Sequence, residues 1–271
     1  MLKILFFGDV VGEPGRKCVK KVLPKLIEQH APDLVLANVE NLAHGKGVTV
    51  KTVEELMRAG VQGFTSGNHI YSKKELSEEV FKKYPDKIVR PFNIPDTYEG
   101  QTAISIETKK GKVLVGNFIG QVFMERQFHD PISSPFAGVD SWIAQHRPED
   151  HAASFIDFHA EATSEKVALG YHLEGRVTVL VGTHTHIPTA DAKILPGGTA
   201  YITDVGMCGA AGSVLGVKKE LSMERFLTEN RVAFDLPEDV SRVEASYVII
   251  EADEKNQKAL NIKAFHEIVD I

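Results

Sequence analysis

Cysteine, basic residues and long apolar runs are all scarce in this sequence. Its 271 residues include 2 cysteines, and 31 basic residues stand against 37 acidic ones, a net charge of −6. Cys18 and Cys208 have no partner at a metal-site spacing, which excludes a disulfide framework and a cysteine-based zinc site, so we expect two free thiols in a reducing cytoplasm. The acidic balance argues against a general binder of nucleic acids or membrane surfaces, which would carry a basic excess.

No stretch of the sequence reaches the roughly 18 apolar residues that a membrane-spanning helix requires. The apolar run before Gly8 is also shorter than the roughly 7–15 residues of a signal-peptide core. We therefore expect no membrane attachment and a cytoplasmic location. With 43% apolar and 25% charged residues, the composition is typical of a globular protein. We predict a single domain over residues 1–271, because no linker, repeat or low-complexity tract divides the chain.

Apolar runs alternate with helical patterns through the first third of the chain. Strands are predicted over Leu2–Phe7, Leu34–Ala37 and Val61–Thr65. Between them, an apolar stripe from Val19 to Ile27 and the stretch Thr52–Ala59 predict helices. This order indicates parallel βαβ units of an α/β fold, in which ligand sites lie at the carboxyl ends of the strands.

The rest of the chain adds further strands and one long segment without a clear period. Strands are predicted over Thr102–Glu107, Val113–Phe118, Ser154–Phe158, Val177–Val181, Ala200–Thr203, Ala245–Ile250 and Ala259–Phe265, and a helix over Ala162–Leu173. Residues 121–148, which contain the single tryptophan, Trp142, are expected to be irregular. A loop of that length is uncommon unless it is functional, so we predict a lid or an oligomer contact there.

Five of the predicted strands are followed by residues that can bind metals or transfer protons. These residues are Asp9, Glu40, Asn41, Asn68, His69, His159, His184 and His186. Because the carboxyl ends of parallel strands meet at one edge of a sheet, we expect them to converge. His184 and His186 are two apart, so in an extended segment both rings would project to the same side. Imidazole, carboxylate and amide oxygens together are ligands for one or two divalent cations.

Each of these clusters has a plainer interpretation when it is taken alone. Asp9 after a strand is more often a turn or a helix cap, and Gly67-Asn68-His69 suits an ordinary loop. A lone His159 is more often a hydrogen-bonded core residue. The conjunction of five clusters, each at the end of a strand, favours a shared metal site.

The order of these motifs resembles that of the calcineurin-like metallophosphoesterases. The matching positions are Asp9, Gly67-Asn68-His69, His159 and Thr183-His184-Thr185-His186. Val11 stands where that family usually has a histidine, and Glu40-Asn41 stand in place of the bridging aspartate motif. These two departures resemble the bacterial YmdB-like phosphodiesterases. The similarity extends through residues 8–12, 38–41, 157–166 and 204–207.

The resemblance implies a four-layer α/β/β/α sandwich with mixed sheets and a centre of two metal ions. It implies that Asp9, Glu40, Asn41 and His186 bind one ion, that Glu40, Asn68, His159 and His184 bind the other, and that His69 is the general acid. The ions, divalent or of mixed valence, would be Fe or Mn, with Zn as an alternative. The implied reaction is attack of a metal-bridging hydroxide on the phosphodiester of a cyclic nucleotide such as cAMP.

Other functions remain open at this stage. The same centre could serve a phosphomonoesterase or an RNA nuclease, with Lys73-Lys74 and Lys218-Lys219 as local basic pairs that could meet RNA. A regulator that binds metal or nucleotide without catalysis is a further alternative, although a spare acid such as His69 beside a complete ligand set favours an enzyme. We expect a small-molecule phosphodiester as the partner, and the segment 121–148 only hints at a homo-oligomer.

Overall fold

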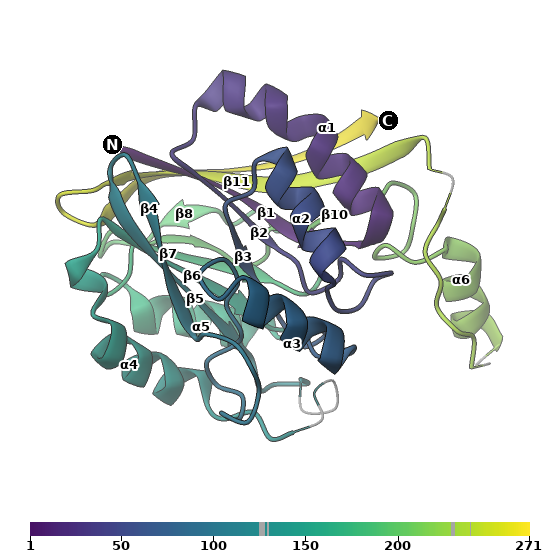
Figure 1. Cartoon of the computed structure of the whole chain (residues 1–271), viewed down its shortest axis with the longest axis horizontal. Coiled ribbons are helices and arrows are strands. Elements are labelled where there is room, and N and C mark those ends of the chain that lie inside the picture. The colour runs from purple at the N-terminus through teal and green to yellow at the C-terminus, as the bar shows by residue number, and fades with distance from the viewer. Residues whose placement is uncertain (125–127, 129, 229–230, 239) are drawn as a thin grey trace.

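Two six-stranded sheets pack face to face, and helices cover the outer face of each (Figure 1). The computed structural model describes residues 1–124, 128, 130–228, 231–238 and 240–271. The first sheet runs, in spatial order, β12 (Lys258–Asp270), β11 (Arg242–Asp253), β10 (Met207–Ala210), β1 (Leu2–Val10), β2 (Leu34–Asn38) and β3 (Gly63–Thr65). The second runs β4 (Ala103–Thr108), β5 (Gly111–Ile119), β6 (Ala153–His159), β7 (Val179–Thr183), β9 (Ala200–Ile202) and β8 (Lys193–Ile194).

The helices form the two outer layers, except for one that stands beside the body of the molecule (Figure 1). They are α1 (Gly12–His30), α2 (Val50–Ala59), α3 (Lys74–Lys83), α4 (Pro135–His146), α5 (Thr163–Leu173) and α6 (Lys219–Thr228), with a 3₁₀ turn, η1, at Pro148–Asp150. α2 begins at the Thr49–Thr52 capping box and ends at Gly60, whose φ of 115° suits glycine. α6 lies off the sheets.

The strand β1 shows why the sheets stack in this way. Leu2, Ile4 and Phe6 point into the core between the two sheets, whereas Leu5 and Phe7 point into the core beneath the helices. Because successive side chains of a strand face opposite sides, a strand covered on both faces is apolar throughout. The predicted four-layer α/β/β/α sandwich with mixed sheets is confirmed.

The carboxyl ends of the parallel strands lie at one edge of each sheet. In the first sheet Asp9 of β1 is opposite Asn38 of β2, and Asn38 is opposite Thr65 of β3. In the second sheet His159 of β6 is opposite Thr183 of β7. Loops that leave these ends therefore start from neighbouring points, and the residues that follow can share one site.

The segment 121–148 differs from the prediction. It is not irregular throughout, because Pro135–His146 form α4, with the Ser134 hydroxyl capping the helix and Pro135 in its first turn. Trp142 is fully buried against Phe118 and donates from its indole N–H to the Thr102 carbonyl, so it is a core residue rather than an exposed contact. Residues 125–127 and 129 of the predicted lid lie outside the described residues.

The structure also bears on the two cysteines and on membrane-spanning helices. Cys18 and Cys208 are buried and free, as predicted. In the part of the chain that the structure describes, every helix is too short or too polar to cross a lipid bilayer.

Candidate metal centre

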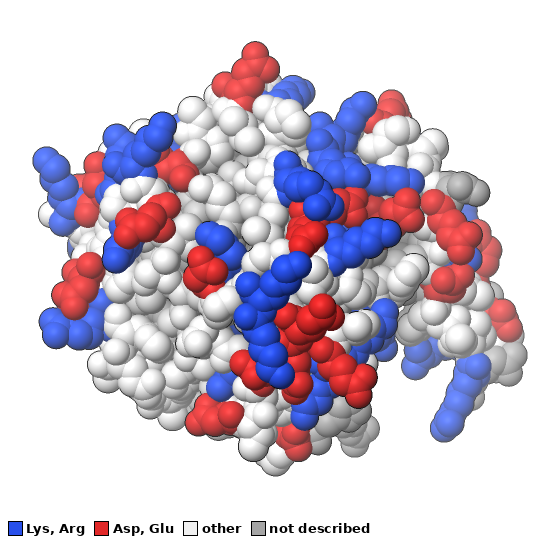
Figure 2. Space-filling view, in the orientation of Figure 1, with Lys and Arg blue, Asp and Glu red and all other residues white. Residues whose placement is uncertain are grey.

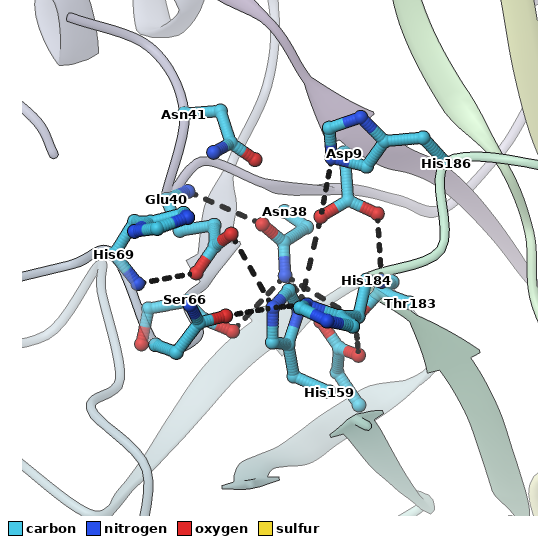
Figure 3. A network of polar contacts seen from close by, with 12 residues as sticks. Asp9, Asn38, Glu40, Asn41, Ser66, His69, His159, Thr183, His184 and His186 are labelled. Carbon is cyan, nitrogen blue, oxygen red and sulfur yellow. Dashed lines mark hydrogen bonds and ion pairs between the residues drawn. The ribbon is translucent and has the colours of Figure 1, made fainter. Parts of the chain in front are cut away.

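The side chains predicted to bind metal come together where the two sheets end side by side (Figure 3). Asp9 is near the end of β1, Glu40 and Asn41 follow β2, Asn68 follows β3, His159 ends β6, and His184 and His186 follow β7. The first five of these are at most 4% exposed. Two carboxylates buried this deeply are costly unless a positive charge accompanies them.

Three potential ligand atoms lie close to a fourth, His159 Nε2, in this cluster. His159 Nε2 is 2.8 Å from Asn68 Oδ1, 3.0 Å from His184 Nδ1 and 3.3 Å from Glu40 Oε1. Donors bound at about 2.1 Å to a common octahedral cation are about 3.0 Å apart. Ligand atoms of Glu40, His159 and His184 all lie within 4.8 Å of one another. The group therefore has the spacing of a cation site.

The outward nitrogens of two histidines show which ring atoms are free to bind a cation. His184 Nε2 is 3.0 Å from Glu161 Oε2, and His186 Nδ1 is 3.1 Å from the Leu215 carbonyl. Carboxylate and carbonyl oxygens only accept hydrogen bonds, so these outward nitrogens carry the protons. The inward nitrogens, His184 Nδ1 and His186 Nε2, are left with lone pairs, the orientation that metal-bound histidines need.

Two buried oxygens on the other side of the cluster have no hydrogen-bond partner among the described residues. Asp9 Oδ1 is one of them, 3.8 Å from His159 Nδ1 and 3.9 Å from His186 Nε2, while Oδ2 accepts from the His184 backbone N–H. Asn41 Oδ1 is the other, and its amide nitrogen donates to the Gly45 carbonyl at 2.9 Å. Unpaired buried acceptors cost free energy that a bound cation would recover, so the residues present fit a metal.

Glu40 connects the two groups of atoms. Its Oε1 faces His159 Nε2, its Oε2 accepts from the His69 backbone N–H at 2.8 Å, and its own N–H donates to Asn38 Oδ1 at 3.2 Å. These contacts fix the carboxylate and also place His69 at the edge of the cluster. The His69 ring is half-buried, with Nδ1 3.5 Å from the Ser72 hydroxyl.

The charges in the cluster are strongly coupled. Burial raises the pKa of Asp9, although His186 and His159 oppose that shift. Burial also acts to raise the pKa of Glu40, but His159 and the His69 N–H outweigh it and lower that pKa. Burial acts to lower the pKa of His159, yet Glu40 and Asp9 raise it to about 9. In the absence of a cation a proton therefore occupies His159, and metal binding would release it.

Two further histidines have lowered pKa values. Burial, reinforced by the charge of His159, lowers the pKa of His184 to about 2, so this ring stays neutral and able to bind a cation. Burial lowers the pKa of His69 as well, with Glu40 opposing that shift.

The segment that carries His184 and His186 is not extended, contrary to the prediction. Their φ angles are 102° and 66°, and the two rings face different partners, His159 and Asp9. Each positive φ at a non-glycine residue costs on the order of 1–3 kcal/mol and persists only where neighbours hold it. Here a buried ion pair holds the loop that follows β7 in this conformation. Lys166 Nζ donates to Asp204 Oδ2 and to the Thr183 carbonyl, both at 2.7 Å, and Asp204 Oδ2 accepts from the Thr185 N–H.

The residues that support the ligands were not identified from the sequence. Asn38, Asp157 and Thr183 lie beneath the cluster, and Lys166 and Asp204 brace the loop after β7. A signal was available, because Asp157 is an acidic residue between apolar neighbours in β6, and the structure buries it fully. Burial raises its pKa to about 6 against the hydrogen bonds that it accepts.

Gly67 leaves no room for a side chain next to the cluster. A Cβ at this position would lie 2.4 Å from Glu40 Oε2 and 2.5 Å from His159 Cδ2. Gly67→Ala is therefore expected to displace both side chains and to abolish metal binding, as measured by elemental analysis. Gly138→Ala in α4 is the control, because its Cβ would keep at least 3.4 Å from the nearest side chains, those of Asn93, Phe118 and Phe92. Equal metal content in the two variants would contradict this geometry.

Removal of divalent cations is expected to destabilise the chain, because the buried Asp9 Oδ1 and Asn41 Oδ1 would be left without a hydrogen-bond partner among the described residues. A cation present at 100 times its Kd stabilises the folded state by about 2.7 kcal/mol, which raises the Tm by roughly 5–10 °C for a chain of this size. Thermal unfolding with Mn²⁺ and with a chelator measures the difference. An unchanged Tm would count against the site.

Residues 5–265 match the family model described as YmdB-like protein. This chain belongs to that family. A relative from Bacillus subtilis, named 2',3'-cyclic-nucleotide 2'-phosphodiesterase, is 42% identical over 262 residues, which are 97% of this chain and 96% of the relative. The predicted family is thus confirmed along nearly the whole length.

Two solved structures of similar proteins agree with the fold. A crystal structure from Mycoplasma pneumoniae, titled a novel phosphatase, is 36% identical with a TM-score of 0.90 and covers 99% of this chain and 94% of its own. A hypothetical protein from Thermus thermophilus is 32% identical with a TM-score of 0.88, and the match covers 98% of this chain and 99% of that one. The predicted enzyme class, a hydrolytic phosphoesterase, is confirmed by these relatives.

Proposed function

We propose that this YmdB-like chain hydrolyses the phosphodiester bond of cyclic nucleotides at a centre that holds two divalent cations. The observation that carries the proposal is the buried group of potential ligand atoms at the sheet edge, in which three atoms lie within 3.3 Å of His159 Nε2 and two oxygens have no hydrogen-bond partner among the described residues. The name of the Bacillus subtilis relative supports a cyclic nucleotide as substrate.

The ligands divide into two sets that share Glu40. Asp9, Glu40, Asn41 and His186 would hold one cation, and Glu40, Asn68, His159 and His184 would hold the other. Their nitrogen and oxygen donors suit Fe or Mn, and also Zn. When bound, such a pair supplies Lewis-acid stabilisation of the phosphate and an activated water as nucleophile. Asp9 and Glu40 are the only carboxylates in the two sets, so they offset two of four positive charges and leave the site attractive to a phosphodiester anion.

His69 would donate a proton to the leaving oxygen. Its backbone is fixed on Glu40 and it directly follows Asn68, so its half-buried ring stays beside the ligands without being one of them. The leaving group of a cyclic nucleotide is an alkoxide, a strong base, and a positioned acid typically contributes roughly 10²–10⁴ in rate.

The nuclease alternative is weakened by the surface charges. Lys73 donates to the Ala43 carbonyl at 2.9 Å and Lys74 faces Glu78 at 3.9 Å. In the other pair, Lys218 forms an ion pair with Asp235, and Lys219 faces Glu220 at 3.9 Å. Acidic and basic side chains are interspersed over the face seen in Figure 2, without a continuous basic stripe on that face.

A substrate panel tests the proposal. Protein loaded with Mn²⁺ is assayed with 2',3'-cyclic AMP, 3',5'-cyclic AMP, a short RNA and 5'-AMP. We expect kcat/KM to be highest for one of the cyclic nucleotides. Faster hydrolysis of 5'-AMP would assign a phosphomonoesterase and faster cleavage of RNA a nuclease, whereas nucleotide binding without turnover would indicate a regulator. Each of these three results would overturn the proposal.

A further inference from the structure

A fully buried carboxylate lies directly behind the candidate metal centre. Asp157 is in β6, two positions before His159, so both side chains leave the same face of the strand. Its Oδ2 accepts from Asn38 Nδ2 at 2.9 Å and from the Thr65 hydroxyl at 2.5 Å, and its Oδ1 accepts from the Thr183 hydroxyl at 2.7 Å. These donors belong to β2, β3 and β7, so one carboxylate joins the two sheets beneath the site.

The hydroxyl of Thr183 stands between Asp157 and His159. An ionised carboxylate can only accept, so the single proton of this hydroxyl is donated to Asp157. Thr183 Oγ1 is also 2.9 Å from His159 Nδ1, and at this contact the oxygen must accept. His159 Nδ1 therefore carries a proton. The other ring nitrogen, Nε2, is the one that faces Glu40, Asn68 and His184.

We propose that Asp157, acting through Thr183, is a positioning residue that keeps a proton on His159 Nδ1 and so leaves Nε2 as the atom that binds a cation. The effect on cation binding rests on the proposed function, whereas the position of the ring proton is a property of this chain alone. The corresponding partners of His184 and His186 are the half-exposed Glu161 and the Leu215 backbone. Of these three rings, His159 is the one oriented by a buried side-chain relay.

Asp157→Asn tests the relay with almost no change in volume. Because Asn38 and Thr65 both donate to Oδ2, the amide oxygen of the new side chain would take that place and its NH₂ group would face Thr183. The hydroxyl would then accept from the amide and donate to His159 Nδ1, which moves the ring proton to Nε2, toward the cation. Replacing the aspartate behind a catalytic histidine of the Ser-His-Asp triad by asparagine has the same consequence, a wrong tautomer with the geometry preserved.

The ring proton can be located without any metal. Nitrogen-15 NMR of the histidine rings in metal-free protein at pH 10.5, where the His159 ring is neutral because its pKa is about 9, is expected to show a protected proton on His159 Nδ1 in the wild type and in Thr183→Ser. We expect Asp157→Asn to lack that proton, and Thr183→Val to have it exchange rapidly with water. An Nδ1 proton equally protected in all four proteins would overturn the inference. Because no cation is present, this result stands even if the proposed metal centre fails.

The second measurement is the affinity for Mn²⁺, obtained by competition with a chelator. Loss of a hydrogen-bond partner behind a metal-binding histidine typically costs 10–100-fold, so we expect a weakening of roughly that size in Asp157→Asn and Thr183→Val, with Thr183→Ser close to the wild type. Thr178→Val is the matched control, because this buried hydroxyl bonds to Ser154 and Gln257 away from the site. Equal Mn²⁺ affinity in Thr183→Val and Thr178→Val would contradict the relay. If Asp157→Asn does not fold, the comparison of Thr183→Ser, Thr183→Val and Thr178→Val still tests the relay.

Discussion

Glu40→Gln is expected to remove metal from both halves of the centre and to reduce kcat/KM by about a thousandfold or more, because stabilisation of several kcal/mol by the cations would be lost. Glu40 is the only residue common to both proposed ligand sets. Both of its oxygens are engaged, one by the His69 N–H and one facing His159 Nε2. An amide would have to turn an NH₂ group toward one of these two places, and it would also remove a negative charge.

Elemental analysis of the purified variant, together with its activity, measures this effect. Glu107→Gln is the matched control, since Glu107 lies on β4 with its side chain 71% exposed beside Lys112. We expect the control to keep the metal content and the activity of the wild type. If Glu40→Gln retained two ions per chain, Glu40 could not be the shared ligand.

His69→Ala is expected to keep its metal and to lose roughly 10²–10⁴ of the rate on cyclic nucleotides, the usual contribution of a general acid. The loss should be much smaller for a nitrophenyl phosphodiester, because nitrophenolate leaves without needing a proton. The ratio of the two losses separates an acid from a residue that merely supports the fold. His69→Asn, which keeps a polar side chain of similar volume, should behave like His69→Ala.

His266→Ala provides the control for this pair of substrates. His266 is on β12, far along the chain from the candidate site, with its side chain 41% exposed near Glu244. Its loss should leave the ratio of the two activities unchanged. Equal losses on both substrates in His69→Ala, with metal content intact, would exclude the role of proton donor.

Local patterns in the sequence were sufficient to predict most of the strands. β1, β2 and β7 are short apolar runs that end in polar residues, and the buried positions of β1 explain that pattern directly. Helix α4 was missed although Ser134 and Pro135 are a regular start signal, because Gly138 and the surrounding prolines suggested a loop. Helix α3 has no local start or stop signal, because Lys73 and Tyr84 flank it, whereas α2, of the same length, has a capping box and ends at Gly60.

The convergence of these residues at one place could be predicted from the sequence, but the residues that support them could not. The ends of parallel strands share an edge, so Asp9, Asn68 and His159 could be placed together from the order of the elements. The contact between Asn38 and Asp157 spans 119 positions and depends on how the two sheets stack. The positive φ angles of His184 and His186 depend likewise on Lys166 and Asp204, which are distant in the sequence.

The central claim is that buried side chains from five strand ends hold a pair of divalent cations. Crystals grown with Mn²⁺ and measured near the manganese absorption edge test it most directly. The account predicts two anomalous peaks, one beside Glu40, Asn68, His159 and His184 and the other beside Asp9, Glu40, Asn41 and His186. Crystals that contain bound Mn²⁺ elsewhere, with no anomalous peak at these residues, would contradict it.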